Sequence, residues 1–130
     1  MKIKKEVIDK IIEHSKKDAP IEACGYLASY EGIIIRHYPL LNIDRSREHF
    51  SFDPKEQFGV LKDIRVEGLE ITAVYHSHPV SPARLSQEDI RLAYDSSISY
   101  VIVSLAGQKS EVKSFRIKDL KVEAENIEVV

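Results

Sequence analysis

Cysteine is almost absent from this sequence, since Cys24 is the only one in 130 residues. A lone thiol forms no internal disulfide, which excludes the small cross-linked scaffolds of secreted proteins. Cys24 lies in an apolar stretch, two residues after Glu22. Burial and a neighbouring carboxylate both disfavour a thiolate, so we expect Cys24 to be a buried structural residue rather than a nucleophile.

The chain also lacks a long apolar run and an excess of either charge. No stretch approaches the roughly 18 apolar residues needed to cross a bilayer, and residues 1–6 contain no apolar signal core. We therefore expect a cytoplasmic protein that does not bind membranes. Lys and Arg number 19 against 21 Asp and Glu, and no basic cluster with interleaved aromatics is present. This balance argues against nucleic acid as a partner.

The composition is that of a folded domain. Hydrophobic residues make up 43% of the chain and charged residues 31%, which is enough apolar material for a core and too much for a disordered chain. The sequence has no internal repeat, no low-complexity tract and no linker. We expect residues 1–130 to form a single domain.

Three helices are predicted from spacing and capping residues. Apolar residues recur at helical spacing across residues 3–19, with charged residues between them. The segment 53–68 begins with an Asp cap, Pro54 at the first helical position and a Glu three residues beyond the cap, and it ends in glycine. The third helix is predicted over residues 86–94.

Apolar runs and alternation predict strands at residues 21–29, 33–38, 47–52, 69–77, 100–105, 112–117 and 120–130. A two-residue Glu-Gly turn makes the first two an antiparallel hairpin. Both faces of segment 69–77 are largely apolar, with Ile71, Ala73 and Tyr75 on one of them, so we expect an interior strand of a covered sheet. The elements together indicate an α/β protein.

Two histidines end that interior strand. His76 and His78 are two residues apart, so their side chains project from one face, and Pro79 then ends the strand where sites in α/β folds lie. Together with Asp89 they match the three protein ligands of a catalytic zinc site that keeps a fourth position open. Hydrolysis also needs a group that takes and returns a proton, and Glu22, a carboxylate outside the ligand set, is the candidate.

The full pattern, an upstream Glu followed by H-x-H-P-x(6)-S-x-x-D, resembles the signature of the JAMM (JAB/MPN+) zinc metalloproteases. The resemblance spans the whole chain in length and element order, and is closest to the compact bacterial and archaeal branch. It implies a JAB/MPN-like, cytidine-deaminase-like three-layer fold, with a mixed central sheet and flanking helices. It also implies one Zn²⁺ per chain held by His76, His78 and Asp89, with Glu22 as general acid/base and Ser86 as hydrogen-bond donor to the developing oxyanion.

Each of these residues also has a simpler interpretation. A single histidine would more often be a core residue bonded to the backbone, and Glu22 alone would be a solvated surface acid. Ser86 and Asp89 match a helix capping box, and both roles can hold together, because a cap fixes the first helical turn and so aims Asp89 at the metal. His37 and His49 stay unassigned, although His49 could line the entrance to the site.

The resemblance implies a hydrolase that cuts an amide or isopeptide bond at the C-terminal tail of a ubiquitin-like or sulfur-carrier β-grasp protein. Such a tail could add to an open strand edge, and residues 44–51 are the candidate contact.

Three other functions compete with the hydrolase interpretation. A non-catalytic binding or scaffold module is an alternative, because the family includes members that lost the metal site, but the intact residue set argues against it. A metal-independent nucleophile at Ser86 is disfavoured, because a serine and Asp89 on one helical turn leave no path for the Asp to orient a histidine. The zinc deaminases need a C-x-x-C pair that one cysteine cannot supply.

Overall fold

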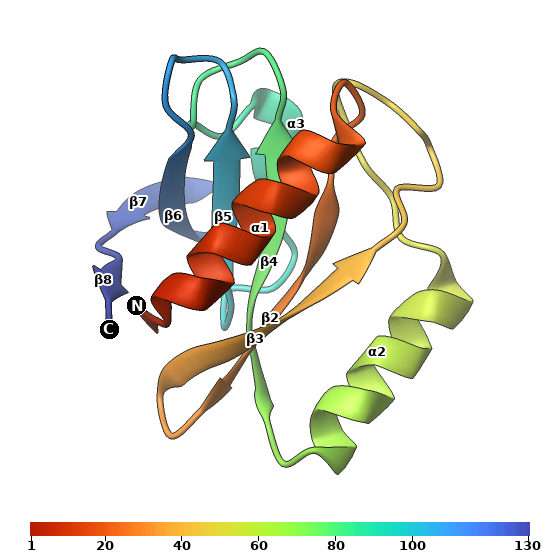
Figure 1. Cartoon of the computed structure of the whole chain (residues 1–130), viewed down its shortest axis with the longest axis vertical. Helices are drawn as coiled ribbons and strands as arrows, with labels where there is room; N and C mark the ends of the chain where they lie inside the picture. Colours follow the sequence, from red (N-terminus) through yellow and green to blue (C-terminus); the bar gives the residue numbers. More distant parts are fainter.

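Eight strands form one mixed sheet with helices on both faces in the computed structural model, which describes residues 1–130 (Figure 1). The strands are β1 (Lys2–Ile3), β2 (Cys24–Tyr30), β3 (Ile33–Leu40), β4 (Glu70–His78), β5 (Ser99–Ser104), β6 (Glu111–Lys118), β7 (Lys121–Glu125) and β8 (Glu128–Val129). The helices are α1 (Lys5–Asp18), α2 (Pro54–Val66) and α3 (Gln87–Arg91). The strand order is β7-β6-β5-β4-β2-β3-β1-β8, and β4 pairs with β5 in parallel, whereas β2 pairs antiparallel with both neighbours. The predicted α/β class with a mixed sheet is confirmed.

The two larger helices cover opposite faces of the sheet (Figure 1). α1 buries Val7 and Ile11 in a cluster with Leu27, Ile34, Ala73, Tyr75, Val101 and Val103. On the other face α2 buries Ile64 against Tyr26, Ala28, Leu40 and Val74. The molecule therefore has three layers, with α1 on one side and α2 on the other. None of the three helices has the length and apolarity to span a bilayer.

β4 lies in the interior of the sheet, between β2 and β5, and its last six residues are buried. Ala73 and Tyr75 share one face, as predicted, and this face packs on α1. Ile71 was also predicted on this face, but its side chain lies on the opposite face of the sheet. The pairing of β2 with β4 skips Thr72, and Ile71 lines a groove on the α2 side together with Val74. One extra residue in a strand reverses the alternation of every side chain before it, which the sequence pattern alone does not reveal.

The two ends of the chain pair with each other. Residues 2–3 form β1, which lies parallel between β3 and β8, so the first helix begins later than predicted. The predicted strand 120–130 is divided into β7 and β8, which occupy opposite edges of the sheet. Only Asn126 and Ile127 separate these two strands, so the edges lie close together and the sheet is curled.

The predicted strand at residues 47–52 is absent. Backbone groups of this segment form hydrogen bonds with residues 42 and 43 of the same loop instead of pairing with a neighbouring strand. Ile43 N–H donates to Ser51 O at 3.1 Å, and Asn42 Nδ2 donates to His49 O at 2.9 Å. Side chains that offer the backbone local hydrogen bonds compete with a sheet ladder, and here they replace it.

The third helix ends at Arg91 rather than at the predicted residue 94. Asp95 turns the chain immediately afterwards, because its Oδ1 accepts from Ser97 N–H at 2.9 Å. The hydroxyl of Tyr100 donates to Asp95 O at 3.0 Å and accepts from Asp95 N–H at 3.1 Å, which fixes this turn to β5. An Asx turn and a strand tyrosine therefore stop the helix after five residues.

Candidate metal centre

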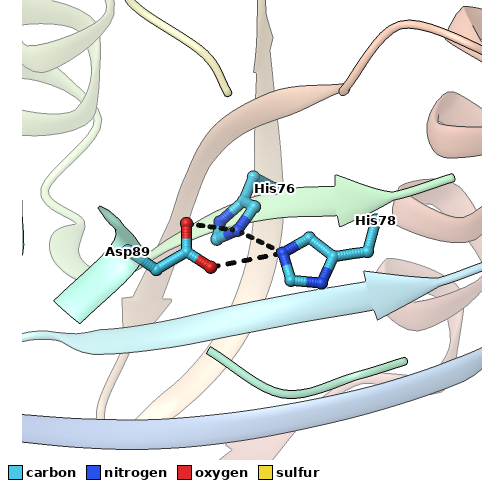
Figure 2. A group of neighbouring side chains, drawn as sticks. All are labelled: His76, His78 and Asp89. Atoms are coloured by element: carbon cyan, nitrogen blue, oxygen red, sulfur yellow. Dashed lines mark hydrogen bonds and ion pairs between the residues drawn. The ribbon is translucent and has the colours of Figure 1, made fainter. Parts of the chain in front are cut away.

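His76 and His78, at the carboxyl end of β4, meet Asp89 of α3 at one point (Figure 2). Their Nε2 atoms lie 3.1 Å apart, and are 3.3 Å and 3.2 Å from Oδ1 and Oδ2 of Asp89 respectively. The exposed fractions of the three side chains are 3%, 6% and 12%. One ligand atom from each residue lies within 4.8 Å of the others, so the three can share an ion.

The hydrogen bonding of His78 suits a metal ligand. Its Nδ1–H donates to the carbonyl of Pro82 at 2.9 Å, which leaves the lone pair of Nε2 directed at the other two residues. The lone pair of His78 Nε2 and the carboxylate of Asp89 are buried next to each other, and such a pair of acceptors is stable only with a cation or a proton between them. Two imidazole nitrogens and one carboxylate oxygen are a ligand set of the kind catalytic zinc takes, so the residues present fit that ion.

The Nδ1 side of His76 is held by packing rather than by a hydrogen bond. Its Nδ1 is buried and has no partner. The ring of Phe50 stacks on the imidazole instead, with centroids 5.0 Å apart. Neither Phe50 nor the Pro82 carbonyl was singled out from the sequence, because no motif marks a residue that acts only through a metal ligand.

Ser86 and Asp89 form the predicted capping box of α3. Ser86 Oγ accepts from Asp89 N–H at 3.0 Å, and Asp89 Oδ2 accepts from Ser86 N–H at 2.9 Å. Burial would raise the pKa of Asp89, but its hydrogen bonds to His76 and His78 outweigh burial and hold that pKa well below its usual range. Ser86 Oγ bonds to a backbone N–H and not to an imidazole, so a Ser-His-Asp relay is not formed.

Glu22 lies between α1 and β2 and is only 3% exposed, so it is not a solvated surface acid. Burial raises its pKa to about 8, with the charge of His78 opposing and that of Asp89 adding to the rise. The next residue, Ala23, is hydrogen-bonded to Ser77 between the two histidines, so Glu22 lies near the metal-binding group, of which it is not a member. A carboxyl group that titrates near neutral pH is suited to proton transfer.

The remaining candidates fall outside the centre. Cys24 is fully buried, and burial raises the pKa of its thiol to about 12, so it is the structural residue that was predicted. Burial lowers the pKa of His37, and the charges of His14 and Lys10 on α1 lower it further. His49 lines a groove beside the centre, as suggested, and its Nδ1 lies 3.1 Å from Asp44.

That groove has a volume of about 570 Å³ and opens beside His76 and Asp89. Its lining is mostly apolar and comes from α2, the middle strands and the segments before α2 and after α3; it includes Tyr26, Phe52, Leu61, Val74, Ile98 and Tyr100. An apolar groove that ends at a cluster of polar groups is the usual form of a binding site.

A three-layer mixed sheet with a His-x-His pair and an Asp at the end of its interior strand defines the class of JAB/MPN domains with a JAMM-type metal site. Residues 4–118 match Prok-JAB, the prokaryotic homologs of the JAB domain, and the chain belongs to this family. The CysO-cysteine peptidase of Mycobacterium tuberculosis is 34% identical over 98% of this chain and 90% of its own. The desampylase of Haloferax volcanii is 31% identical over 77% of each chain.

Solved structures agree with this assignment. The solution structure of a protein from Desulfitobacterium hafniense is 44% identical, covers 99% of this chain and 92% of that protein, and superposes with a TM-score of 0.90. A JAB1/MPN domain protein from Archaeoglobus fulgidus, at 24% identity and a TM-score of 0.69, has the same fold. The predicted JAB/MPN fold is therefore confirmed.

Proposed function

We propose that this chain is a zinc-dependent peptidase that cuts an amide or isopeptide bond at the C-terminal tail of a ubiquitin-like or sulfur-carrier β-grasp protein. The observation that carries this proposal is the convergence of His76, His78 and Asp89 on one point, with the buried carboxyl group of Glu22 nearby. The substrate class follows from its relatives, which are a CysO-cysteine peptidase and a desampylase.

Each residue of the site has a distinct task. His76, His78 and Asp89 would hold one zinc ion per chain, which when bound polarises a carbonyl group and makes water a better nucleophile. Glu22 takes the proton of the attacking water and hands it to the leaving nitrogen. The hydroxyl of Ser86 accepts a hydrogen bond from a backbone N–H, which leaves its own O–H free to donate a hydrogen bond to the developing oxyanion.

The groove beside the centre is the proposed path of the substrate tail. His49 and Ser51 contribute to its wall, which supports the predicted contact with residues 44–51. This segment offers no strand edge, so the tail contacts its side chains instead of extending a sheet there. We also propose that residues 1–130 act as one domain in the cytoplasm, a reducing compartment that suits the unpaired Cys24.

The direct test is cleavage by the purified, zinc-loaded protein. The test uses one substrate protein, a β-grasp carrier from the same organism, in two forms. In one form the carrier is extended by a C-terminal cysteine, and in the other its C-terminus is joined to the side chain of a lysine. Mass spectrometry should show release of the free carrier from at least one form, and addition of a chelator should stop it. If the loaded protein releases the carrier from neither form, the proposal is wrong.

Metal analysis separates this enzyme from a scaffold module. We expect about one zinc per chain in the purified protein, and clearly less in Asp89→Asn, because removal of the carboxylate leaves two ligands. A protein that binds no metal even after dialysis against zinc would instead support the non-catalytic module.

A further inference from the structure

We infer that Asn42 is a positioning residue for Glu22: its side-chain amide holds the backbone of Glu22 and so places the carboxylate beside the metal-binding group. This inference rests on the proposed function, because the importance of that placement depends on Glu22 as the group that moves the proton. Asn42 itself touches neither the metal ligands nor the groove.

The amide of Asn42 is buried, at 3% exposed, and both of its ends are used. Nδ2 donates to Glu22 O at 3.1 Å and to His49 O at 2.9 Å. Oδ1 accepts from Asp44 N–H at 3.1 Å and from Ser51 N–H at 3.3 Å. One side chain therefore organises the segment 42–51 and joins it to Glu22.

Glu22 depends on this segment because it belongs to no helix or strand. Its own N–H donates to Ser46 O at 2.9 Å, so both of its backbone groups bond to residues 42–46. The next residue is held differently: Ala23 N–H donates to Ser77 Oγ at 2.7 Å, and Ser77 N–H donates to Ala23 O at 2.9 Å. Ser77 stands between the two histidines, so Glu22 is fixed between the strand of the metal ligands and Asn42.

No hydrogen bond of its own orients the carboxylate. The side chain of Glu22 makes no hydrogen bond, and its Oε1 is buried without a partner. The position of the carboxylate therefore follows from that of its backbone. Displacement of a reacting group by about 1 Å can lower a rate by about 100-fold, so a weakened backbone contact would be visible in catalysis.

The test uses Asn42→Asp in the zinc-loaded protein, with Ser114→Ala as its control. The aspartate keeps an oxygen that can accept from Asp44 N–H and Ser51 N–H, but it has no N–H to donate to Glu22 O or to His49 O. Ser114→Ala also removes the hydrogen bond of a buried side chain, from Ser114 Oγ to Glu125, but it lies on β6, which β5 separates from the strand of the metal ligands. Should Asn42→Asp not fold, Asn42→Ser, which adds no charge, replaces it.

We expect Asn42→Asp to lower kcat by about tenfold or more with KM within about twofold and zinc content unchanged, and Ser114→Ala to keep kcat within about threefold. In a Glu22→Gln background, Asn42→Asp should reduce the residual kcat no further, because its effect passes through the carboxylate. An unchanged kcat in Asn42→Asp, or an equal fall in both backgrounds, would overturn the inference.

Hydrogen exchange tests the placement without any substrate. The amide of Glu22 donates to Ser46 O, which Asn42 Nδ2 also approaches, at 3.5 Å. In Asn42→Asp this carbonyl and that of Glu22 lose the donor, so the amide of Glu22 should exchange about tenfold faster, whereas the amide of Ala23, which Ser77 holds, should keep its rate. If the wild type cuts no conjugate, the proposed function fails and this measurement alone decides the role of Asn42. Equal exchange at Glu22 in variant and wild type would refute the positioning role whether or not the protein is a peptidase.

Discussion

The phenyl ring of Phe50 lies against the imidazole of His76, with the two ring planes inclined by 29°. Metal-binding histidines are ordinarily oriented by a hydrogen bond from the nitrogen that does not bind the metal. In His76 that nitrogen, Nδ1, is buried and has no partner. The stacked ring therefore takes the place of that hydrogen bond, and together with the contacts of Nε2 to His78 and Asp89 it sets the orientation of this imidazole.

Replacement of Phe50 by alanine should weaken zinc binding. The loss of a group that orients a ligand typically costs about 10–100-fold in metal affinity, and a stacked aromatic pair contributes at the lower end, so we expect about a tenfold higher dissociation constant. Competition with a chromogenic chelator measures it. Phe52→Ala is the matched control, because Phe52 packs on Tyr26 and Phe50 but not on His76. Equal zinc affinities for Phe50→Ala and wild type would contradict the orienting role.

Glu22→Gln should separate catalysis from metal binding. The amide has nearly the shape of the carboxyl group but cannot take a proton, so kcat should fall by about 100-fold or more. Zinc content should equal that of the wild type, because Glu22 is outside the group that can share the ion. Turnover and metal analysis of the same sample check both points. Full activity in the variant would refute the acid/base role, and loss of zinc would mean that Glu22 helps to bind the metal.

The residues at the end of β4 were predictable because their signal is local. Alternation in segment 69–77 and the His-x-His-Pro sequence fix the strand, its end and the face of the two imidazoles within a few residues. The capping residues likewise gave the start of α2, where Asp53 accepts from Lys55 N–H. Glu22 could be identified only through resemblance to a family, because nothing near it in the sequence distinguishes a buried glutamate from an exposed one.

Other contacts depend on packing that the sequence pattern does not show. The alternation in residues 47–52 is that of a strand. In the structure, however, Phe50 of this segment packs on His76, and the carbonyl of His49 accepts a hydrogen bond from Asn42. An asparagine in a loop is usually a turn residue, so its use as a central hydrogen-bonding group left no sign in the sequence. β1 and β8 have two residues each, too few for alternation to be recognised.

Sensitivity to chelators, and not to thiol reagents, should mark the chemistry of this site. Because burial raises the pKa of Cys24 to about 12, almost none of this thiol is ionised at pH 8. Iodoacetamide should therefore leave the activity of the folded protein unchanged over an hour, while a chelator abolishes it and added zinc restores it. The unfolded protein is the positive control for alkylation. Inactivation by iodoacetamide at native conditions would indicate a thiol mechanism instead.

The stability of the protein should depend on pH through His14. Its imidazole lies between Tyr75 and Asp18, with Nδ1 at 2.8 Å from the Tyr75 hydroxyl and Nε2 at 3.1 Å from Asp18. Burial lowers the pKa of His14 below 6.5, and the opposing attraction of Asp18 is smaller. The folded protein therefore binds a proton here less readily than the unfolded chain does. This preference contributes stability above pH 6.5, which is lost as the pH falls toward the folded pKa.

We therefore expect the free energy of unfolding to decrease from about pH 7.5 to about pH 5.5, and to decrease less in His14→Gln, which cannot take the proton. Urea denaturation of the metal-free proteins measures this difference, because zinc release then makes no contribution. His49→Gln is the control, since the His49 side chain is 44% exposed and lies in a loop. If His14→Gln loses as much stability as the wild type over this range, the imidazole of His14 already carries its proton in the folded state, and its bond to Asp18 is an ion pair.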